Sequence, residues 1–494
     1  MIYMPQRAAK WHGFFSRRGI FFLIMVMTIL GTSGAFFFGD AAHAANYVAL
    51  FPSSEGQTCA DNGSRLGTLL EAHNLSAQTR EVFPHLQGAL LDLEASQKEA
   101  LLREIPGTVL ISSARTFRHC AEEAEPSTKK SVTPWHVLWA SYAGLTEGIS
   151  SYAWDSVVIA VMDTGVNRHR DFSEALIYWS LGYNTLTGIS GTEEAVYDDQ
   201  GHGTTVTGTI VGRETGITPQ VGIIPIKCAD SSGYSSTEDL AKSVDYLLGL
   251  LSGPLANRHL ICNFSFATSG NTFYRDEEME MFFKTLFDRI SAAGGLFFAA
   301  AGNENQNVNQ RYVYPSRISS QIFLAVAGTT ETGHLATSFS NYGDRTIDIA
   351  TPGNAIVTTL RDGESLQSVN GTSFASPIAA ATAAALWARN RDLVNWQVRN
   401  VLLNAVDTPL WTAGNSMAPA ASVAVISGGD MAPEKLRESF FVNSTKGIVP
   451  KALNLVNDSE ENSLGGGCHV GATEAPALLL MLLPLAGFCI ARKF

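Results

Sequence analysis

Three short motifs contain residue types that together could carry out nucleophilic chemistry. Asp163 follows the apolar run 157–162 and precedes a Thr-Gly turn. His202 lies between two glycines, and Ser373 lies in the sequence Asn-Gly-Thr-Ser before a long alanine-rich segment. A serine hydroxyl becomes a nucleophile when a histidine removes its proton and a carboxylate orients the imidazole ring. The motifs therefore predict acyl transfer at Ser373, with His202 as the base and Asp163 as the orienting acid.

Each motif taken alone also has an ordinary structural explanation. The Asp-Thr-Gly sequence occurs in aspartic proteases too, and a carboxylate there often only caps a turn. A single histidine is usually a hydrogen-bonded loop residue, and a serine before a helix is usually a helix cap. The presence of all three motifs in one chain favours chemistry. A lipase or an esterase would place its serine in Gly-x-Ser-x-Gly with the acid and the histidine after it, whereas Ser373 lies in Gly-x-Ser-x-Ala with both partners before it.

The segments that must position these residues alternate between apolar strands and amphipathic helices. One predicted helix, 236–251, begins with Ser236 and carries Asp239 three residues later, which is the pattern of a capping box. A second predicted helix covers 277–293. The predicted strands are 157–162, 223–227, 260–266, 296–301 and 322–327. This alternation predicts an α/β fold, a doubly wound, mostly parallel sheet with helices on both faces and with the chemistry at the carboxyl ends of its strands.

The three motifs, in the order Asp, His, Ser, resemble those of the subtilisin family of serine peptidases. The flanking sequences FSNYG and DIATPG extend the resemblance over residues 132–457. The segment 296–306 resembles the family strand that carries the asparagine of the oxyanion hole, which corresponds to Asn303 here. The resemblance implies an endopeptidase that hydrolyses protein or peptide substrates through an acyl-enzyme on Ser373 without a cofactor. The alternative is a catalytically silent surface-binding protein on the same fold, which would be expected to lack one of these residues.

The resemblance also implies a substrate cleft. The strand HLICNFSFA is similar to the family segment that pairs with an extended substrate, so we expect six residues to line the cleft: Ser265, Phe266, Ala267, Ala300, Ala301 and Gly302. Ala267 stands where the family usually has a glycine. Its methyl group could narrow the primary specificity pocket, although core packing explains an apolar residue there equally well. The short connection 212–221 lacks the converging oxygen ligands that calcium requires, so no metal site is expected.

The chain before the first motif divides into three predicted parts. Residues 1–44 have the basic start, apolar run and small-x-small end of a secretory signal peptide, with an uncleaved membrane anchor as the alternative. Residues 45–120 are predicted to form a small α+β unit, whose second helix would begin at a Ser96 cap with Glu99 three residues later. This unit resembles the family's propeptide, an intramolecular chaperone and transient inhibitor; the alternative is an unrelated binding domain. Residues 121–131 are predicted to be a linker.

The peptidase-like region is predicted to cover 132–460, and a separate tail covers 461–494. The tail holds the sequence Gly-Gly-Gly-Cys ending at Cys468, the apolar run 475–491 and an Arg-Lys pair near its end. It resembles bacterial C-terminal sorting signals, and a simple tail anchor is the alternative. We therefore predict a protein exported to the cell envelope or surface, with membrane contact through its terminal hydrophobic segments.

Charge and cysteine content limit the partners and the covalent structure. The formal net charge is -12 and no cluster of Lys and Arg occurs in mid-chain, which argues against nucleic acid as a partner. The six cysteines are scattered and do not form a disulfide scaffold. Cys59 and Cys120 could form one bridge, whereas Cys228 and Cys262 lie in apolar runs typical of buried free thiols.

Overall fold

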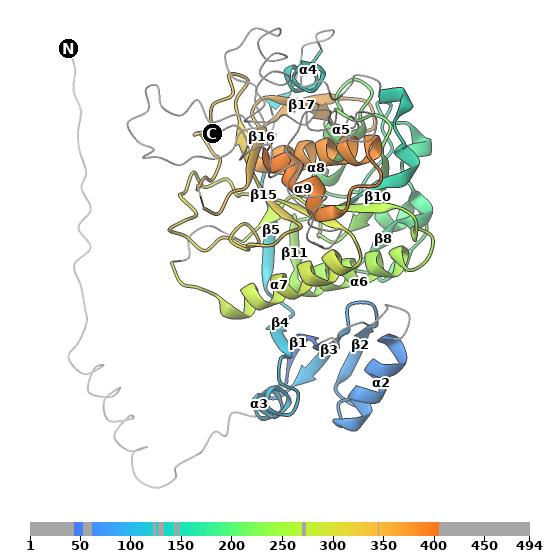
Figure 1. Ribbon diagram of the computed structural model, residues 1–494, viewed down its shortest axis with the longest axis vertical. Coiled ribbons are helices and arrows are strands. Elements are labelled where there is room, and N and C mark those ends of the chain that lie inside the picture. The colour runs from blue at the N-terminus through green and yellow to red at the C-terminus, as the bar shows by residue number, and fades with distance from the viewer. Residues whose placement is uncertain are drawn as a thin grey trace, which may run out of the picture. The chain divides into compact units, whose positions relative to one another are not determined.

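The computed structural model describes residues 44–52, 62–121, 125–126, 133–142, 145, 149–268, 273–343 and 345–404. Apart from Ala44, the predicted signal peptide lies outside the described residues, as does the predicted tail 461–494. Figure 1 labels the elements of the compact unit that begins at Ala45. Within the described part of the chain, no helix is both long enough and apolar enough to cross a membrane.

The central element is an eight-stranded sheet in the order β16-β15-β14-β12-β7-β10-β8-β9. Its strands are β7 (Val157–Asp163), β8 (Tyr183–Asn184), β9 (Ile189–Ser190), β10 (Gly222–Lys227), β12 (His259–Phe264), β14 (Leu296–Ala300), β15 (Phe323–Thr329) and β16 (Ile349–Pro352). Every pairing is parallel except that of β8 with β9. The predicted strands are confirmed, except that 260–266 divides into β12 and the short strand β13 (Phe266–Ala267), which pairs outside this sheet.

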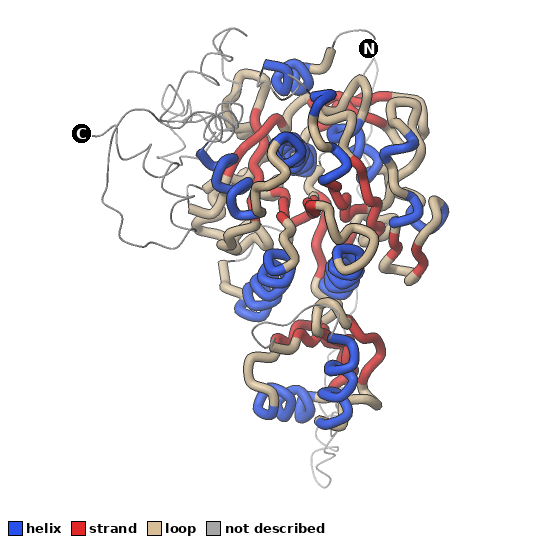
Figure 2. The backbone as a smooth tube through the Cα atoms, turned by 45° about the vertical axis from the view of Figure 1, so that its right-hand side comes forward, coloured by secondary structure: helices blue, strands red, loops and turns tan. Residues whose placement is uncertain are grey.

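Helices cover both faces of this sheet, as Figures 1 and 2 show, so the predicted α/β class is confirmed. The helices of this region are α4 (Trp135–Tyr142), α5 (His202–Val211), α6 (Thr237–Leu251), α7 (Glu277–Ala292), α8 (Thr372–Arg389) and α9 (Asn395–Asn404). α5 and α8 pack together on one face, and α6 and α7 lie on the other. The predicted capping box of α6 is present, because Ser236 Oγ accepts the Asp239 backbone N–H at 3.1 Å.

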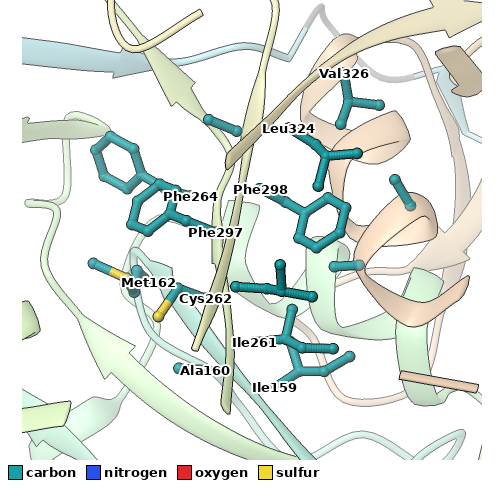
Figure 3. Packing of buried hydrophobic residues seen from close by; sticks show 14 of the residues in the cluster. Ile159, Ala160, Met162, Ile261, Cys262, Phe264, Phe297, Phe298, Leu324 and Val326 are labelled. Carbon is teal, nitrogen blue, oxygen red and sulfur yellow. The ribbon is translucent and has the colours of Figure 1, made fainter. Parts of the chain in front are cut away.

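Alternate side chains of the central strands pack on opposite faces of the sheet. Figure 3 shows Phe298 and Leu324 on the side of α8, whereas Phe264 and Phe297 lie on the other side. On that second side, the ring of Phe287 from α7 lies with its centroid 5.0 Å from that of Phe297. Because both faces are buried, the strands are apolar along their whole length rather than alternating with polar residues.

The residues before Thr116 form a separate small sheet in the order β2-β3-β1-β4, with every pairing antiparallel. Its elements are β1 (Ala45–Leu50), α2 (Asn62–Ala72), β2 (Thr79–Phe83), β3 (Gly88–Leu93), α3 (Ala95–Glu104) and β4 (Val109–Ser112). The helices and strands share their own hydrophobic cluster, which includes Leu70, Leu91 and Leu101. The region therefore has a core distinct from that of the eight-stranded sheet.

The start of α3 differs from the prediction. Its N-cap is Glu94, two residues before the predicted Ser96 cap, and the Glu94 backbone N–H donates to Gln97 Oε1 at 2.8 Å. The predicted pair of Ser96 and Glu99 is wrong because Glu94 and Gln97 make the equivalent three-residue pairing closer to the end of β3. Ser96 consequently lies inside the first turn of the helix.

Two three-stranded sheets complete the structure. In one, β5 (Thr116–His119) lies between β11 (Tyr234–Ser236) and β13 and is antiparallel to both. The other contains β17 (Ile356–Thr359), β18 (Leu366–Val369) and β6 (Glu125–Pro126). Part of the predicted linker 121–131 is thus a strand paired with β18. The chain leaving β4 therefore runs along the carboxyl ends of the parallel strands before it reaches the main sheet.

Candidate active site

Asp163 and His202 form a buried pair at the carboxyl edge of the main sheet. Asp163 is the last residue of β7, and His202 is the first residue of α5. Asp163 Oδ1 lies 2.8 Å from His202 Nδ1 and also accepts the Thr164 backbone N–H at 2.8 Å. Because the carboxylate can only accept, it favours the tautomer with the proton on Nδ1. The other ring nitrogen, Nε2, is then available as a base.

A second carboxylate, Asp198, fixes the loop that presents His202. Its Oδ1 accepts the Thr164 hydroxyl at 2.8 Å and the Gly201 backbone N–H at 2.6 Å, and its Oδ2 accepts the Thr204 backbone N–H at 2.8 Å. Asp198 is fully buried, so these bonds replace the water that the carboxylate loses. Asp198 stands only four residues before His202, but its role was missed from the sequence because its pairing with the Thr-Gly turn is visible only in the fold.

A buried lysine, also missed from the sequence, holds the other side of the Asp163 turn. Lys227 ends β10 directly opposite Asp163 in the parallel register. Its Nζ donates to the Thr164 carbonyl at 2.6 Å and to Asp199 Oδ1 at 2.7 Å. A buried ammonium group requires such partners, and these two tie the turn to the loop before α5.

Ser373 lies in the first turn of α8, and its hydroxyl is bonded to the backbone of another segment. The N-cap of α8 is Gly371, so the alternative that Ser373 is a plain helix cap is wrong. Its Oγ donates to the Ser265 carbonyl at 3.0 Å, while among the described residues His202 Nε2 has no hydrogen-bond partner. The ring of His202 lies 5.7 Å from that of Phe374, the next residue, between ring centroids. The residue after the serine therefore contacts the ring of the base, while the Ser373 hydroxyl itself is bonded to Ser265.

Two hydrogen-bond donors converge on a single carbonyl oxygen beside Ser373. Asn303 Nδ2 donates to the Cys120 carbonyl at 2.7 Å, and the Ser373 backbone N–H donates to the same oxygen at 3.0 Å. Asn303 Oδ1 accepts both the backbone N–H and the hydroxyl of Thr372, at 3.0 and 2.8 Å, which fixes the orientation of the amide. Paired donors on one carbonyl oxygen are the arrangement that stabilises an oxyanion.

The carbonyl comes from the chain itself, directly after β5. The Cys120 backbone N–H donates to the Ser265 carbonyl at 3.1 Å, so the N–H and the carbonyl of Cys120 are both hydrogen-bonded. Gly371 lies against the same carbonyl: a Cβ added there would clash with it and would approach Asn303 Nδ2 to 3.2 Å. No sequence motif marks residues 116–121, and only the path of the chain brings them here.

His119, the residue before Cys120, covers the base. Its ring stacks on that of His202 with centroids 4.6 Å apart, and its neighbour on the other side is Gly233, where any Cβ would clash with the His119 ring. Burial, followed by the charge of His202, lowers the pKa of His119 to about 3. His119 is therefore neutral in this position at neutral pH.

The predicted cleft residues fall into two groups. Ser265, Phe266 and Ala267 lie alongside β5: Ser265 accepts from Cys120, and β13 pairs Phe266 with His119 and Ala267 with Arg118. Ala300, Ala301 and Gly302 follow at the end of β14, where the Gly302 N–H donates to the Thr372 hydroxyl at 3.2 Å. The position of both groups beside a substrate stays a prediction.

The described cysteines are buried and free. Cys228 and Cys262 are buried free thiols, as predicted. Cys120 is also a free thiol among the described residues, and Cys59, with which a bridge was predicted as possible, lies outside them. No group of three or more His, Cys, Asp or Glu side chains suited to hold a metal ion occurs within the described ranges.

Known proteins are similar to this chain in sequence. Residues 155–438, more than half of the chain, match the model of the subtilase family. The minor extracellular protease Epr of Bacillus subtilis (strain 168) is 32% identical over 292 residues, which cover 57% of this chain and 38% of that protein. The cell wall-associated protease of the same organism is 31% identical over 265 residues, 52% of this chain and 26% of that protein, so the chain spans well under half of either relative. A crystal structure of a cold adapted subtilisin-like serine proteinase is similar with a TM-score of 0.46 and 25% identity over 57% of this chain and 91% of that one. The match to the family model shows that the chain belongs to the subtilase family.

Proposed function

We propose that this chain is a serine endopeptidase that hydrolyses proteins or peptides through an acyl-enzyme on Ser373. One observation carries the proposal: the Asn303 amide and the Ser373 backbone N–H bind the same carbonyl oxygen, at 2.7 and 3.0 Å. His119, the residue before Cys120, stacks on His202, whose Nδ1 lies 2.8 Å from Asp163 Oδ1. A nucleophile, a base, an orienting acid and an oxyanion site around one peptide group are the parts that acyl transfer requires.

The reaction begins when the Ser373 hydroxyl turns from the Ser265 carbonyl toward His202 Nε2. Nε2 removes the hydroxyl proton as Oγ attacks the carbonyl carbon, while Asp163 keeps the ring in place through Nδ1. The charge that develops on the oxygen is stabilised by Asn303 and the Ser373 N–H. His202 then protonates the leaving amine, and a water molecule, deprotonated by His202, releases the acyl group. These steps use only side chains of this chain and need no cofactor.

Residues 45–120 fit the role of a propeptide that inhibits the enzyme until it is removed. β5 lies between β11 and β13 as an extended substrate would, and its end occupies the oxyanion site. A strand in this place excludes other substrates. The region also has its own hydrophobic cluster, which a separable inhibitor needs in order to fold.

Export to the cell envelope is the part of the proposal that depends on sequence alone. It rests on the signal-like segment 1–44 and the tail with Cys468, both outside the described ranges. The relatives named above are an extracellular protease and a cell wall-associated protease, which is consistent with export. Fractionation of cells that express the full chain, compared with a chain lacking 461–494, tests whether the tail retains the protein at the envelope.

The activity itself is tested with the Ser373→Ala variant of the full chain. We expect the wild type to react with a fluorophosphonate probe and to lose its N-terminal region, and the variant to do neither. Ser190→Ala, at an exposed serine of β9, is the matched control and should behave as the wild type. A wild-type chain that is folded but neither reacts nor processes would contradict the proposed function.

A further inference from the structure

The peptide bond between Cys120 and Ala121 lies in the position for attack. The carbonyl of Cys120 is bound by Asn303 and Ser373, and its N–H is bound by Ser265. On the far side of the bond, a Cβ at Gly371 would approach Ala121 Cα to 3.0 Å. Gly371 therefore lies against the backbone of both Cys120 and Ala121, the two residues that the bond joins. The register of β5 against β13, in which His119 faces Phe266, keeps this bond and not a neighbour in place.

The side chain of Cys120 is buried in a pocket of the cleft. Only 6% of the residue is exposed, and its thiol lies beside the backbone of Ala267 and the hydroxyl of Thr372. Ala267 is itself 3% exposed, and its methyl group takes up room that a glycine would leave free. Burial, followed by the nearby charge of Glu304, raises the pKa of the Cys120 thiol, so the side chain stays neutral. The pocket therefore suits a small uncharged group.

A second side chain of the same strand is held in an aromatic pocket. Phe117, three residues before Cys120, is 1% exposed. Its ring makes edge contacts with Phe264 of β12 and Phe283 of α7, each with ring centroids 5.6 Å apart. Edge contacts between aromatic rings stabilise a buried ring by more than the burial of its apolar area alone. Arg118 lies between Phe117 and Cys120 in the strand and is exposed, so we expect no preference for a particular side chain at its position.

From these contacts we infer that the chain cuts itself between Cys120 and Ala121, and that its substrates share the pattern around that bond. The pattern is a small uncharged residue before the cleaved bond and an aromatic residue three positions earlier. Ala267 and Phe283 are then the residues that determine specificity. This inference rests on the proposed function and adds the substrate class to it.

The step balances with groups already in place. A bond forms between Ser373 Oγ and the Cys120 carbonyl carbon, and the bond from that carbon to the Ala121 nitrogen breaks. The serine proton passes through His202 to the new amino group of Ala121. Water then hydrolyses the ester and leaves a carboxylate on Cys120.

The cleavage position is tested on the full chain by mass spectrometry and N-terminal sequencing of the processed enzyme. We expect Ala121 as the new N-terminus in the wild type and in Cys120→Ala, with at least about tenfold slower processing in Cys120→Phe and Cys120→Lys. A new N-terminus elsewhere between 113 and 131, or faster processing of either bulky variant, overturns the inference. Fluorophosphonate labelling is measured in parallel, because an enzyme that labels but cuts elsewhere contradicts only the inference, whereas one that does not label contradicts the proposed function.

The substrate class is tested with quenched fluorescent peptides that carry the sequence of residues 115–122. Alanine at the Cys120 position should be tolerated, whereas phenylalanine or lysine there, or alanine at the Phe117 position, should lower kcat/KM by about tenfold or more. Ala267→Gly should partly restore cleavage after phenylalanine, and Phe283→Ala should remove the preference for an aromatic residue without slowing the peptide that lacks it. Equal cleavage of all peptides by an enzyme preparation that is shown to be active, by fluorophosphonate labelling of a separate sample, overturns the inference.

Discussion

Among the contacts between the N-terminal region and the peptidase region, two differ in kind. At the inner contact, β5 lies in the cleft and presents the Cys120 carbonyl to its donors. At the outer contact, the turn after β2 lies on α6, where Asp245 Oδ1 accepts the backbone N–H groups of His85 and Leu86 at 2.7 Å each. The proposed cleavage would cut the chain at the inner contact and leave the outer one untouched. Inhibition after cleavage therefore depends on how long each contact persists.

The two contacts also respond to pH in opposite directions. The pKa of His119 falls from 6.5 to about 3 in the cleft, so binding excludes a proton, and the inner contact is complete above about pH 6.5 and weakens as the pH falls toward 3. Burial raises the pKa of Asp245 from 3.8 to about 6, although the His85 and Leu86 amides oppose the shift. Binding at the outer contact therefore takes up a proton, so its contribution is complete below about pH 3.8 and is lost as the pH rises through about 6.

The largest expected effect is on the rate of precursor processing, which should depend on the inner contact and not on the outer one. Asn303→Ala should slow the processing of the precursor by about 10²–10³-fold, because it removes one of the two donors to the Cys120 carbonyl. Asp245→Asn should process at the wild-type rate, since the outer contact has no part in the reaction. Precursor conversion followed by gel electrophoresis measures both. Equal slowing of the two variants would mean that the inner and outer contacts are not distinct.

The sequence predicted the parts of this comparison that depend on local patterns. Apolar strands and the Ser236 cap of α6 were recognisable because periodicity and capping act over a few residues. The position of Cys120 was not, because it depends on β5 pairing with strands more than a hundred residues later. The direction of the Ser373 hydroxyl, toward Ser265, likewise depends on a contact between distant segments that no motif encodes. Asp198 and Lys227 were missed because a buried charge is visible only once its partners are in place.

The pH dependence of the inner contact is isolated by removing that of the outer one. In an Asp245→Asn, Ser373→Ala background, the separately produced region 45–120 should bind about 30-fold more weakly at pH 5.0 than at pH 7.5, because free His119 with a pKa of 6.5 must lose its proton on binding. Calorimetry or fluorescence titration measures the affinity without any cleavage. Adding His119→Phe, which keeps a ring over His202, should abolish the change. A weakening that survives this substitution would assign the effect to another group.

The reverse experiment isolates the outer contact. In a His119→Phe, Ser373→Ala background, the same region should bind up to about tenfold more tightly at pH 5.0 than at pH 7.5, because Asp245 takes up a proton with a pKa near 6. Asp245→Asn should make the affinity independent of pH in that background. Weaker binding in acid would contradict the assignment, and it would direct attention to Glu81 and His85, whose charges also act on Asp245.

The smallest effect should come from an ion pair that joins α3 to α7. Lys98 Nζ on α3 lies 3.0 Å from Glu278 Oε1 on α7, and both side chains are partly exposed, at 26% and 43%. A pair in this setting contributes less than about 1 kcal/mol, so Lys98→Met should weaken the binding of region 45–120 by no more than about fivefold. Because Lys98 also lies over the ring of Tyr47, methionine preserves the apolar stem and removes only the charge. The loss should shrink further in high salt. A loss comparable to that of the His119 or Asp245 variants would show that charge pairing, and not the backbone bonds to Asp245, holds the outer contact.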